Sequence, residues 1–284
     1  MTDLAPAGRL DVIDLYPEER GLLLELLSDL GPKDWDRETE CPAWSVKGIA
    51  LHLLGDDLSL LSRQRDEAPP GVVFDVTVGK WQGLMGGLDE FNERWVAAAD
   101  FFSPTLLIDL LRMTGEWTHR WYAAVDPERR GEPVLWVSPA PAPYWLLRER
   151  EYAERWIHQL QIRRAVDRPG LAEARFVVPA VGAAMRGLPL ALSALRADVG
   201  AALTLSIEAE TTHSWTVVRS ESAWSLHDGE PVEPTARLVV DLETAASLFS
   251  RGLSREDARA GIRTEGDDEL GSTLAAGIAA FFGR

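Results

Sequence analysis

The sequence is poor in cysteine and in basic residues, and each shortage excludes a class of protein. Cys41 is the only cysteine among 284 residues, so the chain can form no internal disulfide and no cluster of thiolate metal ligands. Acidic residues outnumber basic ones, 45 to 29, and the formal net charge is −16. This charge opposes binding to phosphate backbones and to anionic membranes. We therefore expect neither a nucleic-acid partner nor a membrane partner.

Long apolar segments are absent as well. The sequence contains no run of about 18 uncharged apolar residues, the length that a membrane-spanning helix requires. Its first residues, MTDLAPAGRLDVIDLYPEER, lack the apolar core of a signal peptide. A cytoplasmic location is the resulting expectation. The composition, 46% hydrophobic and 26% charged, is ordinary for a globular protein, and the length is sufficient for two domains.

Helical signals dominate the first part of the chain. Leucines recur with helical spacing across residues 17–30. Ser45 is the expected N-cap of a second helix, which ends near Asp66 before the prolines that begin at Pro69. The remaining expected helices span roughly 79–100, 103–124 and 144–166. These segments predict an all-helical domain over residues 1–168.

The pattern changes after about residue 170. A helix is expected over 178–196, and then Leu203, Leu205 and Ile207 alternate with polar residues, which is typical of a half-buried strand. The same alternation recurs near residues 215–217, 224–226 and 238–240, and helices are expected at about 243–250 and 267–282. These patterns predict an α+β domain over residues 172–284, with the strands arranged as an antiparallel meander.

Three residues of the helical part form a candidate metal site. Glu154 and His158 are four residues apart on one expected helix, so both side chains can reach the same point. A carboxylate and an imidazole are good ligands for Zn²⁺ or a similar ion, and a third ligand must come from another helix. His52 is the best candidate, because its helix is apolar on nearly all sides and should be central in the bundle. The ordinary alternatives are an exposed Glu/His pair and a core histidine.

Small residues flank His52. Gly48, Gly55 and Ser59 share a stripe with this histidine along the expected helix. A stripe without bulk leaves room for a metal and a bound ligand, or allows another helix to approach closely. The sequence does not decide between these two interpretations.

Two further carboxylates and the cysteine lie near the candidate ligands in the sequence. Asp56, one turn after His52, can hydrogen-bond a ligand or a bound water, or can be a solvated helix acid. Glu151, three residues before Glu154, can support the site in the same way, act as an alternative ligand, or be a surface carboxylate. Cys41 precedes a proline at a turn, and we interpret it as a packing residue rather than as a nucleophile.

Two segments resemble the metal motifs of one protein family. The segment CPAWSVKGIALHLLGDD resembles a motif of the mycothiol-dependent maleylpyruvate isomerase family, which belongs to the DinB-like group of metal-binding four-helix bundles. The segment YAERWIHQLQIRRA is similar to the second metal motif of that family. The resemblance implies a DinB-like four-helix bundle in which His52, Glu154 and His158 are the metal ligands.

The resemblance extends to the rest of the chain, with one departure. The segments from LTLSIEAE to LFSRGLSREDARAGIRTEGDDELGSTLAAGIAAF are similar to the small sterol-carrier-like domain of the family. After the second histidine the family tends to read H-R-W-D, whereas this chain reads His158-Gln159-Leu160-Gln161. The missing aspartate leaves open what orients His158 and which substrate is bound.

The resemblance also implies a chemistry. Three protein ligands leave a fourth position open on the ion, where the thiol of mycothiol would bind and lose its proton. Zn²⁺ is the expected ion, and Ni²⁺ or Fe²⁺ are alternatives. The thiolate would add to a small electrophile, and for maleylpyruvate addition, bond rotation and elimination would give the trans isomer, fumarylpyruvate.

Two other functions suit the same site. A mycothiol S-transferase would make a stable conjugate with an epoxide or a halide, and a non-catalytic protein would bind a metal or an apolar ligand without turnover. By resemblance we expect the isomerase. The expected partner is then a small-molecule substrate, and the protein is expected to be a monomer or a weak homodimer.

Overall fold

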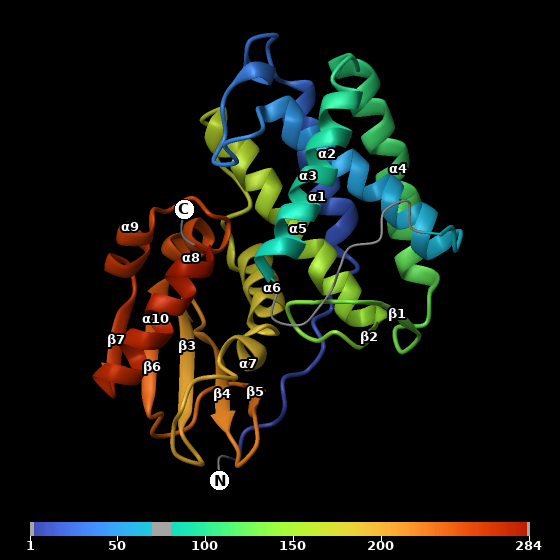
Figure 1. Cartoon of the computed structure of the whole chain (residues 1–284). Helices are drawn as coiled ribbons and strands as arrows, with labels where there is room; N and C mark the ends of the chain where they lie inside the picture. Colours follow the sequence, from blue (N-terminus) through green and yellow to red (C-terminus); the bar gives the residue numbers. More distant parts are fainter. Residues whose placement is uncertain (1–2, 70–80, 283–284) are drawn as a thin grey trace. The chain divides into compact units, whose positions relative to one another are not determined.

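The structure, a computed structural model, describes residues 3–69 and 81–282, with the backbone alone for 81–89 and 280–282. The chain divides into two compact units (Figure 1). The helical unit comprises Val12–Leu135 and Pro139–Pro169, and the sheet unit comprises Met1–Asp11, Trp136–Ser138 and Gly170–Arg284. The sequence predicted a boundary between residues 168 and 172. Two short segments that precede this boundary, Met1–Asp11 and Trp136–Ser138, group with the sheet unit.

The helical unit consists mainly of helices. They are α1 (Leu15–Ser28), η1 (Asp34–Asp36), α2 (Val46–Leu60), the π-helical turn η2 (Leu61–Arg65), α3 (Trp81–Ala99), α4 (Pro104–Ala124) and α5 (Tyr144–Ala165), with a hairpin of β1 (Arg130–Pro133) and β2 (Pro141–Pro143) before α5. Ser45 caps α2 as predicted, since its side chain accepts a hydrogen bond from the backbone of Gly48. Residues 79–80 of the expected third helix lie outside the described residues.

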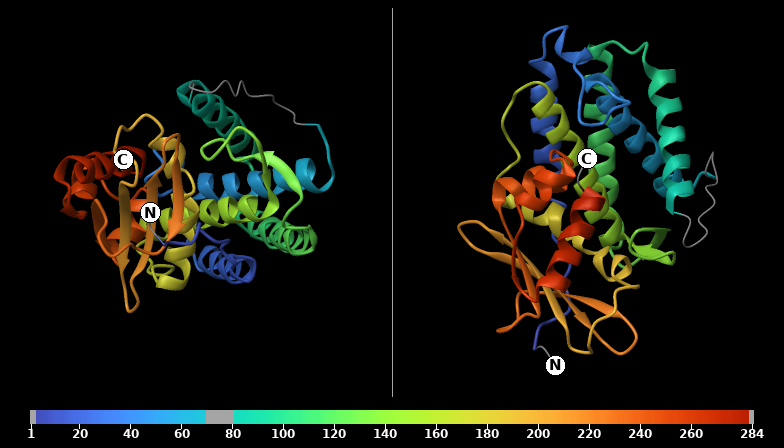
Figure 2. Two further views of the ribbon diagram at one scale, coloured as in Figure 1. Left: turned by 90° about the horizontal axis from the view of Figure 1, so that it is seen from below. Right: turned by 60° about the vertical axis from the view of Figure 1, so that its left-hand side comes forward.

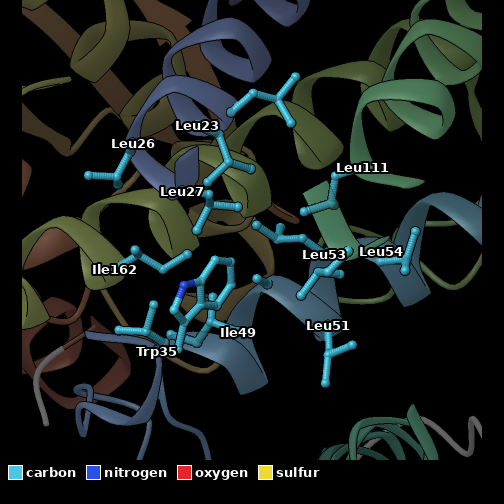
Figure 3. Packing of buried hydrophobic residues seen from close by; sticks show 14 of the residues in the cluster. Leu23, Leu26, Leu27, Trp35, Ile49, Leu51, Leu53, Leu54, Leu111 and Ile162 are labelled. Atoms are coloured by element: carbon cyan, nitrogen blue, oxygen red, sulfur yellow. The ribbon is translucent and has the colours of Figure 1, made fainter. Parts of the chain in front are cut away.

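Helices α1, α2, α4 and α5 form the predicted four-helix bundle. Helices α1 and α2 each contact both α4 and α5, and α3 packs against α2 (Figure 2). Apolar side chains from the four helices meet in one core, which includes Leu27, Ile49, Leu111 and Ile162 (Figure 3). Each fully buried side chain of this size stabilises the fold by about 1.5–3 kcal/mol. Helix α2 is buried along most of its length, as its sequence predicted.

Tryptophans fill the stripe of small residues on α2. The indole of Trp95, on α3, donates a hydrogen bond to the carbonyl oxygen of Leu51 at 2.7 Å. A Cβ atom added at Gly55 would lie 2.5 Å from Nε1 of Trp95, and one added at Gly48 would lie 2.9 Å from Cβ of Trp44. At these two positions the glycines therefore allow close packing rather than leaving space for a ligand.

Replacing Gly55 by alanine is expected to destabilise the protein by about 1–3 kcal/mol, because the new methyl group displaces Trp95 from its hydrogen bond. Gly21, on α1, is a matched control, since an added Cβ there meets nothing within 4 Å. Gly21→Ala should stabilise its helix by roughly 0.5–1 kcal/mol. Urea unfolding followed by tryptophan fluorescence measures both changes, and equal effects of the two substitutions would contradict the packing argument.

The sheet unit is an α+β domain, as predicted. Its strands are β3 (Ala202–Glu208), β4 (His213–Arg219), β5 (Trp224–Asp228), β6 (Ala236–Asp241) and β7 (Arg263–Gly266), in the order β5-β4-β3-β6-β7. Its helices are α6 (Ala174–Met185), α7 (Leu188–Ala191), α8 (Leu242–Phe249), α9 (Arg255–Ala260) and α10 (Asp268–Phe282). Helices α8 and α10, drawn in red in Figure 1, pack against strands β3 and β6.

The expected meander is correct only for β3, β4 and β5. Strand β6 does not continue it but pairs with β3, in the parallel direction. This pairing places Leu238 beside Leu205 and Val240 beside Ile207, so the apolar side chains of both strands share one buried layer. The remaining pairs of the sheet are antiparallel.

Strand β3 is buried on both faces, whereas its alternation predicted a half-buried strand. Thr204 and Ser206 have no exposed surface. Their hydroxyl groups are satisfied across the β3–β4 pair, where Oγ1 of Thr204 lies 2.8 Å from Oγ1 of Thr216 and Oγ of Ser206 lies 2.8 Å from Oγ of Ser214. Because threonine and serine can satisfy their own hydroxyl groups in pairs, polar residues here do not mark an exposed face.

The expected helix at 178–196 is replaced by α6 and α7. The break contains Gly187, where a Cβ atom would lie 2.7 Å from the ring of Trp136. Pro189 follows in the first turn of α7, where a missing backbone N–H is tolerated. The close approach of Trp136 to this break also places residues 136–138 in the sheet unit.

The N-terminal segment belongs to the sheet unit because it lies along the edge strand β5. Pro6 forms an antiparallel bridge with His227, and the backbone N–H of Ala7 donates to the carbonyl oxygen of Leu226 at 3.0 Å. No helix in the described part of the chain is long and apolar enough to cross a membrane.

Candidate metal centre

The two predicted histidine ligands meet inside the helical unit. His52 on α2 and His158 on α5 have ring centroids 4.7 Å apart, with the ring planes nearly perpendicular. Both residues are buried, at 6% and 8% exposure. Since the two residues are 106 positions apart in the sequence, it is the packing of α2 against α5 that brings the two imidazoles together.

Each histidine has a carboxylate one helical turn away. Nε2 of His158 lies 3.6 Å from Oε2 of Glu154, as the i,i+4 spacing predicted. Nε2 of His52 lies 3.2 Å from Oδ2 of Asp56. The described cluster thus contains two imidazoles and two carboxylates, contributed equally by α2 and α5.

Gln161 is hydrogen-bonded to Nδ1, the other ring nitrogen of His158. Its Oε1 lies 2.9 Å from Nδ1 of His158, and it also accepts a hydrogen bond from the thiol of Cys41 at 3.2 Å. Gln161 is the residue that replaces the aspartate of the family pattern. Gln161 therefore supplies a side-chain oxygen that can orient His158, but, unlike an aspartate, it carries no negative charge.

The indole of Trp44 covers His52. The two rings are stacked, with centroids 4.6 Å apart. The ring centroid of Trp44 also lies 6.2 Å from that of His158. Trp44 thereby covers one side of the two histidines.

Burial and neighbouring charges shift the pKa values of the cluster. Burial, together with the charge of His158, lowers the pKa of His52 to about 3. Burial alone would lower the pKa of His158, but its interactions with Cys41 and Glu154 raise it instead. The His158 interaction in turn holds the pKa of Glu154 below its ordinary value, against the effect of burial. The pKa values of the two histidines are therefore shifted in opposite directions, that of His52 downwards and that of His158 upwards.

The donor atoms suit a divalent ion, although they do not form a ready-made cage. Within the described residues, no three His, Cys, Asp or Glu side chains are grouped closely enough to hold a metal ion as they stand. The nitrogens and oxygens at the meeting of α2 and α5 are nonetheless the types that Zn²⁺, Ni²⁺ and Fe²⁺ accept. The ligand roles of His52, Glu154 and His158 remain a prediction.

Glu151 belongs to a buried charge network rather than to the histidine cluster. The residue is 3% exposed, which excludes the surface carboxylate among the three alternatives. Its carboxylate accepts a hydrogen bond from Arg155 at 2.9 Å and also pairs with Arg150. Glu151 and Arg155 are four residues apart on α5, so their side chains lie next to each other and can pair inside the protein.

Asp57 is the centre of this network. Its carboxylate is fully buried and accepts hydrogen bonds from Arg155 at 2.6 Å, from Arg20 at 2.7 Å and from Thr114 at 2.7 Å. Burial alone would raise the pKa of Asp57, but the two guanidinium groups lower it. One carboxylate thus links α1, α2, α4 and α5.

The sequence interpretation missed this network. The available signal was that Asp57 lies on α2, a helix that is apolar on nearly all sides and was expected to be central in the bundle. A buried charge requires a partner, so such positions predict an ion pair without naming its members.

Glu19 is a second buried carboxylate, next to this network. It has no exposed surface, and neither of its oxygens has a hydrogen-bond partner among the described residues. Burial raises its pKa, while the charges of Arg20 and Arg155 act in the opposite direction. Its ionised form is therefore unfavourable in the folded protein.

Glu19→Gln is expected to stabilise the protein at neutral pH by about 1–3 kcal/mol, because it removes a buried charge that lacks hydrogen bonds. A carboxyl whose pKa is raised on folding contributes stability below its unfolded pKa and loses it as the pH rises. The advantage of the variant should thus grow above pH 4.5, the ordinary pKa of glutamate. Urea unfolding at several pH values measures it, and an advantage that is independent of pH would contradict the assignment.

Comparison with solved structures supports the fold. The crystal structure of a mutant of the mycothiol-dependent maleylpyruvate isomerase is 11% identical to this chain, covers 89% of it and 91% of its own chain, and has a TM-score of 0.51. A second crystal structure of that isomerase has the same identity and coverage, with a TM-score of 0.49. At this identity the likeness concerns the fold alone.

A smaller structure matches a shorter part of the chain. The solution structure of palmitated sterol carrier protein 2-like 2 from Aedes aegypti is 24% identical, covers 30% of this chain and 78% of its own, and has a TM-score of 0.25. No curated protein matches the chain.

The sequence itself matches a known family. The model of the mycothiol maleylpyruvate isomerase N-terminal domain family matches residues 16–163, a stretch that begins in α1 and ends in α5. It includes most of the bundle core and the four residues of the histidine–carboxylate cluster. Because this stretch is more than half of the chain, the protein belongs to the mycothiol maleylpyruvate isomerase N-terminal domain family.

Proposed function

We propose that the protein is a metal- and mycothiol-dependent enzyme that acts on a small electrophile, with cis–trans isomerisation of the maleylpyruvate type as its reaction. The observation that carries this proposal is the meeting of His52 and His158, with Glu154 beside them, in a chain of this family. Membership of the family supports the thiol, and the donor atoms of the cluster support a divalent ion.

His52, Glu154 and His158 would hold the ion, with Zn²⁺ expected and Ni²⁺ or Fe²⁺ as alternatives. A bound divalent ion lowers the pKa of a coordinated thiol, so that thiolate is available at neutral pH. Gln161 accepts the hydrogen bond from Nδ1 of His158 and thereby leaves Nε2 as the ligand atom. Low exposure of both histidines keeps bulk water from competing at the site.

Cys41 is not required by this proposal, because the cofactor supplies the nucleophilic sulfur. The thiol of Cys41 donates to Gln161, and its expected role is to fix that amide beside His158. This residue therefore offers a test of which thiol reacts.

The test of function is turnover of maleylpyruvate by the Zn²⁺-loaded protein with and without mycothiol. Fumarylpyruvate should form only when mycothiol is present, and Cys41→Ala should retain most of the activity. Formation of a stable conjugate with an epoxide or a halide, without isomerisation, would assign the protein to the S-transferases instead. Loss of all activity in Cys41→Ala would show that the reacting thiol belongs to the protein.

A spectroscopic experiment separates an enzyme from a non-catalytic binder. When mycothiol is added to the Co²⁺-substituted protein, sulfur ligation should produce a new charge-transfer band in the near ultraviolet. An unchanged spectrum at saturating thiol would contradict the proposal.

A further inference from the structure

Two arginines lie farther along the two helices that carry the histidines. On α5, Arg150 is one helical turn before Glu154, which is in turn one helical turn before His158. After α2, Arg63 lies in the π-helical turn η2, and its Nε donates a hydrogen bond to Oγ of Ser59 at 3.0 Å. Ser59 belongs to the stripe of small residues on α2. Each helix that contributes a histidine therefore also contributes an arginine beside the cluster.

Arg63 and Arg150 are close enough for their positive charges to act on each other. Burial lowers the pKa of Arg63, and the charge of Arg150 lowers it further, while the charge of Asp56 acts in the opposite direction. The side chains of the two arginines are 28% and 31% exposed, whereas those of His52 and His158 are 7% and 10% exposed. The arginine pair thus lies nearer to the solvent than the two histidines do.

The protein does not use all the hydrogen-bond donors of the two guanidinium groups. In the described part of the chain, Arg63 donates from Nη1 to Glu132 and from Nε to Ser59. Arg150 donates from Nη2 to Glu151, and its Nε is buried without a hydrogen-bond partner among the described residues. Because a guanidinium group has five N–H donors, both arginines keep donors for a further acceptor.

We propose that Arg63 and Arg150 form a subsite for a carboxylate group of the substrate. The inference rests on the proposed function for the reaction and names its substrate class, a small electrophile that carries a carboxylate, rather than a neutral epoxide or halide. A carboxylate between the two guanidinium groups would relieve their repulsion and accept the bidentate hydrogen bonds that arginine favours. A local pair of cations is needed, because the net charge of −16 otherwise repels anions.

Arg150→Gln in the full-length protein is the first test. Glu151 keeps its hydrogen bond from Arg155 at 2.9 Å, so the fold should be retained, and circular dichroism verifies this. Binding of maleate, a stable dicarboxylate, is measured by isothermal titration calorimetry without thiol, first with Zn²⁺ and again after a chelator has removed the ion. Maleate binding should weaken by about 10-fold or more under both conditions, because a charge-assisted hydrogen-bond donor is lost.

Three further variants sharpen the result. Arg63→Gln should weaken maleate binding to a similar extent, and Glu132 then keeps its hydrogen bond from Gln64 at 3.1 Å. Arg150→Lys should restore part of the affinity, because lysine keeps the charge but loses the planar fork of donors. Arg112→Gln, at an exposed position of α4, is the matched control and should bind maleate as the wild type does.

Kinetics separate substrate binding from a merely structural role. With maleylpyruvate and mycothiol, Arg63→Gln and Arg150→Gln should raise KM by about 10-fold and change kcat less, because the carboxylate contact is shared by the ground state and the transition state. The affinity for Zn²⁺ should be unchanged in both variants. Loss of kcat and of Zn²⁺ binding, without a rise in KM, would show that the arginines only support the fold of the site.

The outcomes also distinguish this inference from the proposed function. Equal maleate binding by the wild type and the two glutamine variants, or no maleate binding by the wild type, would overturn the subsite and leave the proposed function. Tighter binding of inorganic phosphate than of maleate would overturn the assignment to a carboxylate. Maleate binding that depends on both arginines, in a protein that does not turn over maleylpyruvate, would support the subsite and contradict the proposed reaction.

Discussion

Asp57→Ala is expected to destabilise the protein by about 3–5 kcal/mol, because it removes the carboxylate that two buried guanidinium groups share, although Arg155 keeps its pairing with Glu151. The side chains of Arg20 and Arg155 that pair with Asp57 are 8% and 4% exposed, so water cannot replace the lost partner. Thr114 loses the acceptor of its hydroxyl group in the same substitution. The cost arises mainly from the unpaired charges that remain and not from the strength of the ion pair itself.

Urea unfolding followed by tryptophan fluorescence measures this effect, since nine of the eleven tryptophans precede residue 170. The matched control is Glu90→Ala, which removes an ion pair with Arg94 on the exposed face of α3, where the side chains are 63% and 75% exposed. That control should cost less than about 1 kcal/mol. Similar losses in the two variants would mean that Asp57 is solvated in solution and does not link the four helices.

His52→Ala is expected to abolish stoichiometric binding of Zn²⁺ while the fold is retained. The substitution removes one of the two imidazoles, and Glu154 and His158 alone are too few ligands for a tight site. The affinity should fall by more than the 10- to 100-fold that is typical of losing an outer partner of a ligand. His158→Ala should behave in the same way.

Elemental analysis of the dialysed protein measures the metal content, and circular dichroism reports the fold. His119→Gln is the control, because this residue lies on α4 and no side-chain contact with the cluster involves it. The control should bind the wild-type amount of Zn²⁺. Full retention of metal in His52→Ala would remove this histidine from the site and, with it, the basis of the proposed function.

Much of the helical unit was predictable because its signals are local. Ser45 marks the start of α2 through a hydrogen bond within three residues, and the i,i+4 spacing of Glu154 and His158 brings their side chains together whatever surrounds the helix. The apolar character of α2 likewise predicted its central position. A periodic pattern is sufficient for such features, since the helix repeat alone determines which residues share a face.

The sheet unit shows where local patterns are insufficient. The alternation around residues 238–240 predicts a strand, and β6 is one, but the same alternation suits a neighbour on either edge of the sheet. Burial of a shared apolar layer beside β3 decided the pairing. The burial of Thr204 and Ser206 was equally unpredictable, because their hydroxyl partners are on another strand.

The sequence by itself determined the change from helical to alternating patterns near residue 170, the principal helices and the pair formed by Glu154 and His158. Only the tertiary structure decided that Gln161 orients His158, that Trp95 packs against Gly55, that Asp56 faces the same cluster, and that Asp57 pairs with Arg155, 98 residues away. The physical reason is that secondary structure follows from interactions within a few residues. The partner of a buried charge, in contrast, depends on the register in which whole helices pack.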